Sequence, residues 1–161
     1  MNYSEIDIKE FINETVPAYN KASVVEALKK SPDELEQLGM QLTGETGNRS
    51  FIVKTGANTT SNNSLWQCIK SEVYDYFCTK SAKYRAERNK AEINIKNILT
   101  IIATAIASQF NLAIGVVAGA VTVAIISVFK IGKNAWCELS KAGIQIISAT
   151  LMDEWREVAN C

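Results

Sequence analysis

The chain has 161 residues, of which 47% are hydrophobic and 21% charged, with 17 Lys and Arg against 17 Asp and Glu. This length suffices for one domain with its own core, and the balanced charge favours neither a nucleic acid nor an acidic partner for the chain as a whole. Histidine is absent, which excludes Ser-His-Asp and Cys-His catalytic arrangements and leaves zinc only an all-cysteine set of ligands.

The N-terminal part of the chain predicts three short helices. Residues 4–16 and 20–30 form the first two, and Pro17 separates them because proline cannot continue a helix. The third begins at Ser31-Pro32-Asp33-Glu34, which supplies a cap, a proline at the first helical position and an acidic residue at the third. This helix is expected to stop at Gly44.

The composition changes over residues 43–63, which are rich in Gly, Thr and Asn. These residues favour turns and local hydrogen bonds over helix, so the segment is predicted to be an irregular loop that is flexible or faces a ligand. Ser50-Phe51-Ile52-Val53-Lys54 is a candidate for one short β-strand within it. Residues 1–63 are interpreted as an N-terminal helical regulatory region.

A second region, 64–161, starts with Ser64 as the cap of a further helix. No Gly or Pro occurs between Leu65 and Gly115, so this helix could continue through the basic stretch 80–96. That stretch is a candidate contact for anionic lipid or for an anionic ligand such as a nucleotide or oligonucleotide, with a solvated helix face as the alternative. Its basic residues are Lys80, Lys83, Arg85, Arg88, Lys90 and Lys96.

From Asn97 to Phe129 the chain carries no charged side chain. A straight helix over this run would be about 50 Å long, whereas the hydrocarbon core of a bilayer is about 30 Å thick. Ser108-Gln109-Phe110-Asn111 interrupts the run and offers a turn. The sequence therefore predicts a helical hairpin with legs over about 97–108 and 112–129. Basic residues flank both ends of the run, and a hairpin would return both to one membrane face.

Two patterns within the hairpin are candidates for function. Small residues recur every four positions, and Gly115-x-x-x-Gly119 would allow close approach of two helices in lipid. This predicted packing seam comprises Ala103, Ala107, Asn111, Gly115 and Gly119. Hydroxyl groups also recur at four-residue spacing and could face water in a pore, or else bond to their own backbone. These candidate pore-lining residues are Thr100, Thr104 and Ser108.

The C-terminal part, 134–159, has apolar residues at steps of three or four and predicts an amphipathic helix or helix pair. The four cysteines lie far apart without C-x-x-C spacing. They are expected to be reduced thiols in a cytosolic environment. The predicted fold is all-α, a helical bundle with a long apolar hairpin and one irregular loop.

The uncharged Ala, Ile, Val and Gly hairpin, TAIASQFNLAIGVVAGAVTVAII, resembles the hydrophobic hairpin of colicin-type pore-forming domains. The resemblance covers 97–129 and implies a hairpin that is buried in a soluble helical bundle and inserts into a membrane when triggered. The chain also resembles, in size, small bacterial membrane effectors of anti-phage, abortive-infection systems. In these a cytosolic portion controls a two-helix membrane segment.

Three functions are consistent with the sequence. The first is an oligomeric membrane-inserting pore or ion-channel effector gated by its soluble portion. The second is a membrane-anchored adaptor without channel activity, in which 1–63 bind a partner protein. The third is a soluble helical oligomer that buries the apolar segment, since so short a chain is not expected to cover it alone. The expected location is the bacterial inner membrane with cytoplasmic soluble portions, and neither an enzyme activity nor a cofactor is expected.

Overall fold

The computed structural model describes residues 5–45, 64–90 and 93–150, with side chains described up to residue 141. All regular structure in these residues is helical, which confirms the predicted all-α bundle. Most of loop 43–63, including the candidate strand at 50–54, lies outside the described residues, as does the end of the predicted helix 134–159.

The helices follow the chain in a simple order. Three N-terminal helices are joined by short connections, and a single-turn 3₁₀ helix follows the second. The elements are α1 (Glu5–Thr15), α2 (Ala18–Glu26), η1 (Ala27–Lys29), α3 (Pro32–Leu42), α4 (Leu65–Cys78), η2 (Ala82–Tyr84), α5 (Arg85–Arg88), α6 (Ile95–Phe110), α7 (Ile114–Ile131) and α8 (Lys133–Thr150).

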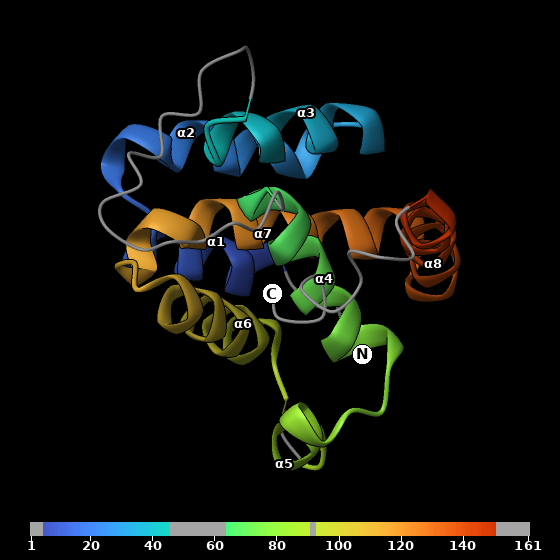
Figure 1. Cartoon of the computed structure of the whole chain (residues 1–161). Coiled ribbons are helices and arrows are strands. Elements are labelled where there is room, and N and C mark those ends of the chain that lie inside the picture. Colours follow the sequence, from blue (N-terminus) through green and yellow to red (C-terminus); the bar gives the residue numbers. More distant parts are fainter. Residues whose placement is uncertain (1–4, 46–63, 91–92, 151–161) are drawn as a thin grey trace.

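The centre of the bundle is α7. It packs against α1, α2, α3, α4, α6 and α8, and Figure 1 shows it between α2 and α3 on one side and α6 on the other, with α8 across its end. Every residue from Val117 to Val128 is buried. A single chain therefore covers the apolar helix, and the expectation that other copies are needed to cover it is wrong.

The predicted helix caps at Ser31 and Ser64 are confirmed. The Ser31 hydroxyl accepts a hydrogen bond from the Glu34 N–H, and the Glu34 carboxylate accepts one from the Ser31 N–H, which together form a capping box. This carboxylate is fixed by the backbone bond, so the pKa of Glu34 is lowered. Ser64 caps α4 through the Gln67 N–H, and α1 ends at Thr15, before Pro17.

Trp66 joins the N-terminal helices to α4. Its ring lies against Gly39 of α3, where an added Cβ would be only 2.3 Å from two ring atoms. The indole Nε1 donates to the Glu36 carboxylate at 2.9 Å, and Lys70 Nζ reaches the same oxygen at 2.7 Å. Glycine is required at position 39 because the ring occupies the space of a side chain.

The prediction that one helix continues from Leu65 through the basic stretch is wrong. α4 ends at Cys78, and α6 begins only at Ile95. Thr79 Oγ1 donates to the backbone carbonyl and to the carboxylate of Asp75, both at 2.7 Å, and Arg88 donates to the carbonyls of Tyr76, Thr79 and Ser81. Side chains thus satisfy the backbone groups at which the helix stops.

The expectation of reduced thiols is also wrong for the three described cysteines, Cys68, Cys78 and Cys137, which are all disulfide-bonded. Cys78 at the end of α4 forms a disulfide with Cys137 of α8, with 5.6 Å between the Cα atoms. No cysteine in the described part of the chain is a free thiol. The bond joins α4 and α8, which both pack against α7. The helices α1–α3 contain no cysteine and therefore no disulfide.

Candidate functional site: the α6–α7 hairpin

The apolar segment folds as the predicted hairpin. Its first leg, α6, is longer than expected, its second leg, α7, has the expected length, and the two meet at a turn around Asn111. Asn111 adopts the left-handed conformation with φ 53°, and the Leu112 N–H donates to the Ala107 carbonyl at 2.8 Å. Asn is one of the few residues that take this conformation readily, so the polar interruption provides the turn.

The second leg, α7, is apolar on every side. Its mean hydropathy is 2.3 over 18 residues, and of the described helices only α7 is long and apolar enough to cross a membrane. The hydroxyls of Thr122 and Ser127 bond to carbonyls four residues earlier, at 2.7 and 3.1 Å. The core helix of a soluble protein has the same properties, so α7 alone does not distinguish lipid from protein surroundings.

The first leg, α6, has two different faces. Its buried face consists of Ile95, Ile98, Leu99, Ile102, Ala103, Ile106 and Ala107. Its exposed face is polar but uncharged and consists of Asn97, Thr100, Thr104, Ser108 and Gln109. The three candidate pore-lining residues thus share one wet face, and Thr100 bonds to the Lys96 carbonyl at 2.9 Å.

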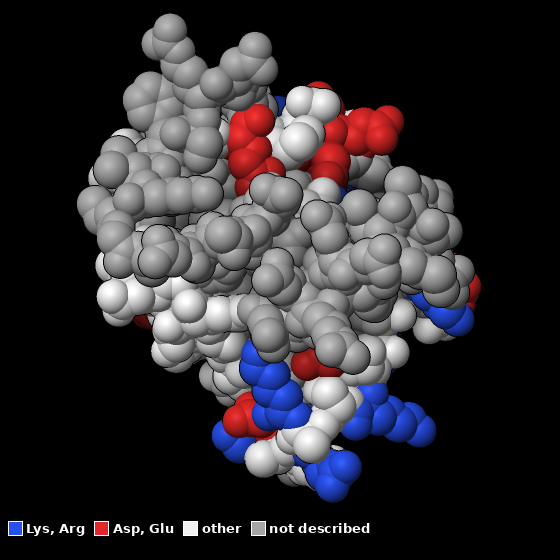
Figure 2. Space-filling view, in the orientation of Figure 1, with Lys and Arg blue, Asp and Glu red and all other residues white. Residues whose placement is uncertain are grey.

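The uncharged outer face of α6 differs from the outer faces of α1 and α8, whereas the exposed residues of α4, Gln67 and Ser71, are also uncharged. The exposed residues of α1 include four charged ones, and those of the described part of α8 include three. They are Glu5, Lys9, Glu10 and Glu14 in α1, and Lys133, Glu138 and Lys141 in α8. The area that α6 occupies at the lower left of Figure 1 is largely white in Figure 2.

The predicted seam is divided between several contacts. Ala103 and Ala107 are buried, whereas Asn111 is exposed in the turn. An added Cβ on Gly119 would lie 3.2 Å from the Val24 side chain, and one on Gly115 would lie 3.3 Å from the carbonyl oxygen of Thr15. In this structure the two glycines allow the N-terminal helices to pack closely against α7, and they do not contact a second hairpin. A seam between copies stays a prediction.

The candidate basic residues fall into two groups. Arg88 bonds to backbone carbonyls, and Lys96 lies 2.9 Å from carboxylate oxygens of both Glu10 and Glu14, which raise its pKa. The other four are exposed around α5, and we call them the basic corner. They are Lys80, Lys83, Arg85 and Lys90. Figure 2 shows blue side chains at the lower edge, where Figure 1 places α5.

A buried polar cluster beside the basic corner has no counterpart in the sequence analysis. The Glu72 carboxylate, 5% exposed, accepts a hydrogen bond from the Tyr84 hydroxyl and pairs with Lys83. Burial and the bond to Glu72 raise the pKa of Tyr84 above its usual range. The contact joins α4 to η2 across a turn, so no helical spacing in the sequence indicates it.

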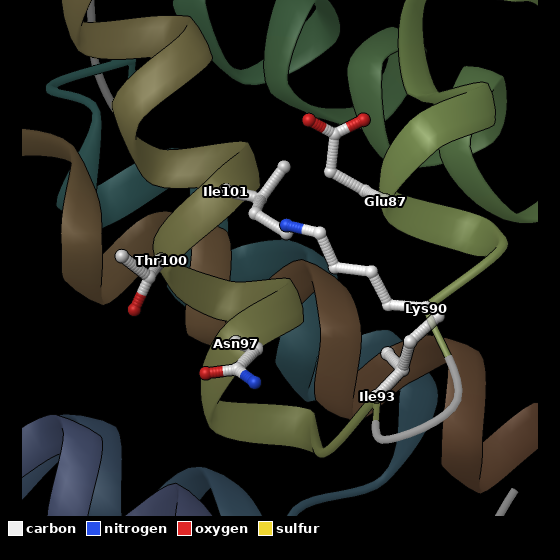
Figure 3. A pocket seen from close by; sticks show the side chains of 6 residues that line it. All are labelled: Glu87, Lys90, Ile93, Asn97, Thr100 and Ile101. Atoms are coloured by element: carbon white, nitrogen blue, oxygen red, sulfur yellow. The ribbon is translucent and has the colours of Figure 1, made fainter.

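A shallow cavity of about 250 Å³ lies between α5 and α6. Glu87, Lys90 and Ile93 line one side, and Asn97, Thr100 and Ile101 of α6 line the other (Figure 3). The Lys90 side chain extends across it towards Ile101. The cavity therefore places the basic corner directly beside the uncharged face of α6. No cluster of side chains suited to a metal ion occurs among the described residues.

Comparison with known proteins adds no relative. No protein-family model, curated sequence or solved structure matches the chain significantly.

Proposed function

We propose that the chain is a membrane-inserting pore or ion-channel effector that stores α6 and α7 in a helical bundle and oligomerises in the membrane. The soluble helices around the hairpin gate its release. We further propose that it acts as a toxin-like effector in bacterial antiviral defence, a setting suggested only by the size and the architecture of the chain.

The uncharged outer face of α6 carries this proposal. A charged side chain on an exposed helix position usually changes folding stability by less than about 0.5 kcal/mol, so folding gives no reason to exclude charge there. Crossing a bilayer does give one, because a Lys, Arg or Asp at the centre of a membrane helix costs about 2.5–3.5 kcal/mol. The exposed residues of α6, from Asn97 to Gln109, carry no charge. Entry into a bilayer requires this absence of charge, whereas folding in water does not.

The hydroxyl groups of α6 suit the wall of a pore. Thr100, Thr104 and Ser108 face water in the bundle, and in an oligomer of hairpins the same face would line a water-filled path. α7, apolar on every side, would then face lipid and neighbouring helices. In this arrangement the hydroxyl-bearing face of α6 stays in contact with water, and only the apolar faces of the hairpin move from protein to lipid surroundings.

The disulfide indicates from which side of the membrane the chain would insert. Disulfides persist in oxidising compartments and are rare in the cytosol. The bond between Cys78 and Cys137 therefore weighs against the expected cytoplasmic placement of the soluble portions and favours approach to the membrane from an oxidising side. A bacterial inner membrane remains the proposed target, now from its outer face.

Two other functions make different predictions. A soluble bundle needs α7 only as its core, which the burial of Val117–Val128 also fits. An adaptor uses the hairpin as an anchor and needs no water path. Neither accounts for an exposed α6 face without charge in a chain that is 21% charged.

The three functions separate in one assay with the purified chain and potassium-loaded vesicles that contain phosphatidylglycerol. A pore predicts that the protein floats with the vesicles and releases potassium. An anchor predicts flotation without release, and a soluble bundle predicts neither, so either of these results would overturn the proposal.

A further inference from the structure

We infer that the flank of the bundle along α6, from the basic corner to the hairpin turn, is the surface that docks on an anionic bilayer while the chain is still folded. This inference rests on the proposed function and names the first contact. It is drawn from three adjoining features: an exposed apolar tip, the uncharged face of α6 and the basic corner.

The apolar tip lies at the turn end of the hairpin. Ile114 is 37% exposed, Val116 is 52% exposed, and Tyr19 of α2 is 79% exposed. Gly115 brings the two segments together, because an added Cβ there would lie 3.6 Å from the ring of Pro17, two residues before Tyr19. The exposed large hydrophobic residues within two positions of this contact along the chain are Tyr19, Ile114 and Val116, which we call the apolar tip, and Tyr suits the membrane–water interface.

No charge interrupts the path from the tip along α6. The turn and the exposed face of α6 are uncharged back to Asn97. At Asn97 and Thr100 the cavity with Lys90 and Glu87 begins (Figure 3), and the rest of the basic corner follows. Lys96, the residue before Asn97, is paired with Glu10 and Glu14 of α1. One flank therefore presents apolar, then neutral, then basic groups over the length of α6.

A bilayer fits this flank better than a protein partner does. The exposed apolar area of the tip is on the order of a few hundred Å², whereas a stable protein interface needs about 800 Å² from each partner. A few inserted side chains together with a basic cluster are typical of peripheral membrane contact. The basic corner complements the negative charge of anionic lipids, and each basic residue near the surface strengthens binding about fivefold. The tip also includes the first residues of α7, the candidate membrane span. Docking would therefore bring the N-terminal end of α7 into contact with lipid first.

Flotation of the folded chain with vesicles tests the inference. The vesicles contain phosphatidylcholine with or without phosphatidylglycerol, and the disulfide is left intact. Val116→Glu places an acidic residue in the first turn of α7, which suits a helix N-terminus and preserves folding. It should weaken binding about tenfold, because it replaces an apolar anchor with a charge. Tyr19→Ser serves as a second variant and should weaken binding in the same direction.

The matched control is Leu139→Glu, since Leu139 is 63% exposed on α8 and lies beyond the opposite end of α7. It should bind as the unaltered chain does. In the basic corner, Arg85→Gln with Lys90→Gln should lower binding about fivefold per residue and only with phosphatidylglycerol present. Lys29→Gln with Lys133→Gln, both exposed elsewhere, should have no such effect.

The inference is overturned if Val116→Glu and Tyr19→Ser bind at the level of the unaltered chain, or if Leu139→Glu loses binding equally. Loss of a dimer in the Val116→Glu variant without any vesicle binding would also overturn it and would assign the tip to a second copy. Potassium release in the same samples separates the two proposals. Docking without release would overturn only the pore, and release that does not depend on Val116 or Tyr19 would overturn only the docking surface.

Discussion

The two legs of the hairpin each carry a single lysine, at the outer end of the leg, but lie in different surroundings. α7 is enclosed by six other helices, so the lack of charge in the rest of this helix follows from its place in the core. α6 has one face in water, and that face also lacks charge. The more apolar leg, α7, is therefore less informative about function than α6. The proposed membrane role rests on α6, the leg whose composition the fold does not require.

The largest expected effect comes from a charge in α7. Val121→Asp would bury a carboxylate without a partner in the core, which costs about 3–5 kcal/mol and leaves little of the stability typical of a domain. Circular dichroism and urea unfolding should show a largely unfolded chain. A cooperative transition at the original urea midpoint would contradict the enclosure of α7.

The disulfide should have the next largest effect. Replacing Cys78 and Cys137 together with Ala removes the covalent link between α4 and α8 and should lower the free energy of unfolding by about 2–4 kcal/mol. Under the proposed function, the same variant should also release vesicle contents faster, because one cover of α7 is loosened. Unchanged unfolding in urea would show that the bond does not hold α8 in place.

Gly119→Leu tests the packing of α7 against the N-terminal helices. An added Cβ at Gly119 already approaches Val24 to 3.2 Å, so the larger side chain should overpack the contact and cost about 1–3 kcal/mol. Ala113→Leu, at an exposed position beside the turn, is the matched control and should be close to neutral. Loss of activity in Gly119→Leu alone would therefore not establish a seam between copies.

The smallest effect concerns the ion pairs between α1 and the start of α6. Hydrogen bonds from Lys96 to Glu10 and Glu14 raise the pKa of Lys96 above its ordinary 10.5. A raised pKa of a basic group stabilises the fold fully below the unfolded value, and this contribution is lost as the pH rises through the folded value. The difference in urea midpoint between the unaltered chain and Lys96→Met should be constant near neutral pH and shrink above about pH 10.5. A difference that grows with pH would contradict the ion-pair assignment.

Local signals in the sequence predict much of this fold. Ser31 and Ser64 cap helices as expected, and the polar break before Leu112 is the hairpin turn because Asn111 takes a left-handed conformation. The four-residue spacing of Thr100, Thr104 and Ser108 also correctly places them on one face of a helix.

Other features depend on contacts between distant residues and leave no local signal. The break after Cys78 contains no Gly or Pro and is fixed by the Asp75–Thr79 bonds and by Arg88. The pairing of Cys78 with Cys137 spans 59 residues, and spacing alone does not reveal it. The short helices α1–α3 cover α7 because Gly115 and Gly119 let them approach closely, which composition and length do not show.

The most direct test of the membrane role of α6 is potassium efflux from phosphatidylglycerol vesicles for Thr104→Lys beside Gln37→Lys. Both positions are exposed on helices, so both variants should unfold in urea as the unaltered chain does. Thr104→Lys should reduce efflux at least about tenfold, because a lysine must either cross the bilayer or form a ring that repels potassium in the pore. Gln37→Lys should leave efflux unchanged. Equal efflux from both variants and the unaltered chain would contradict a membrane function for the uncharged face of α6.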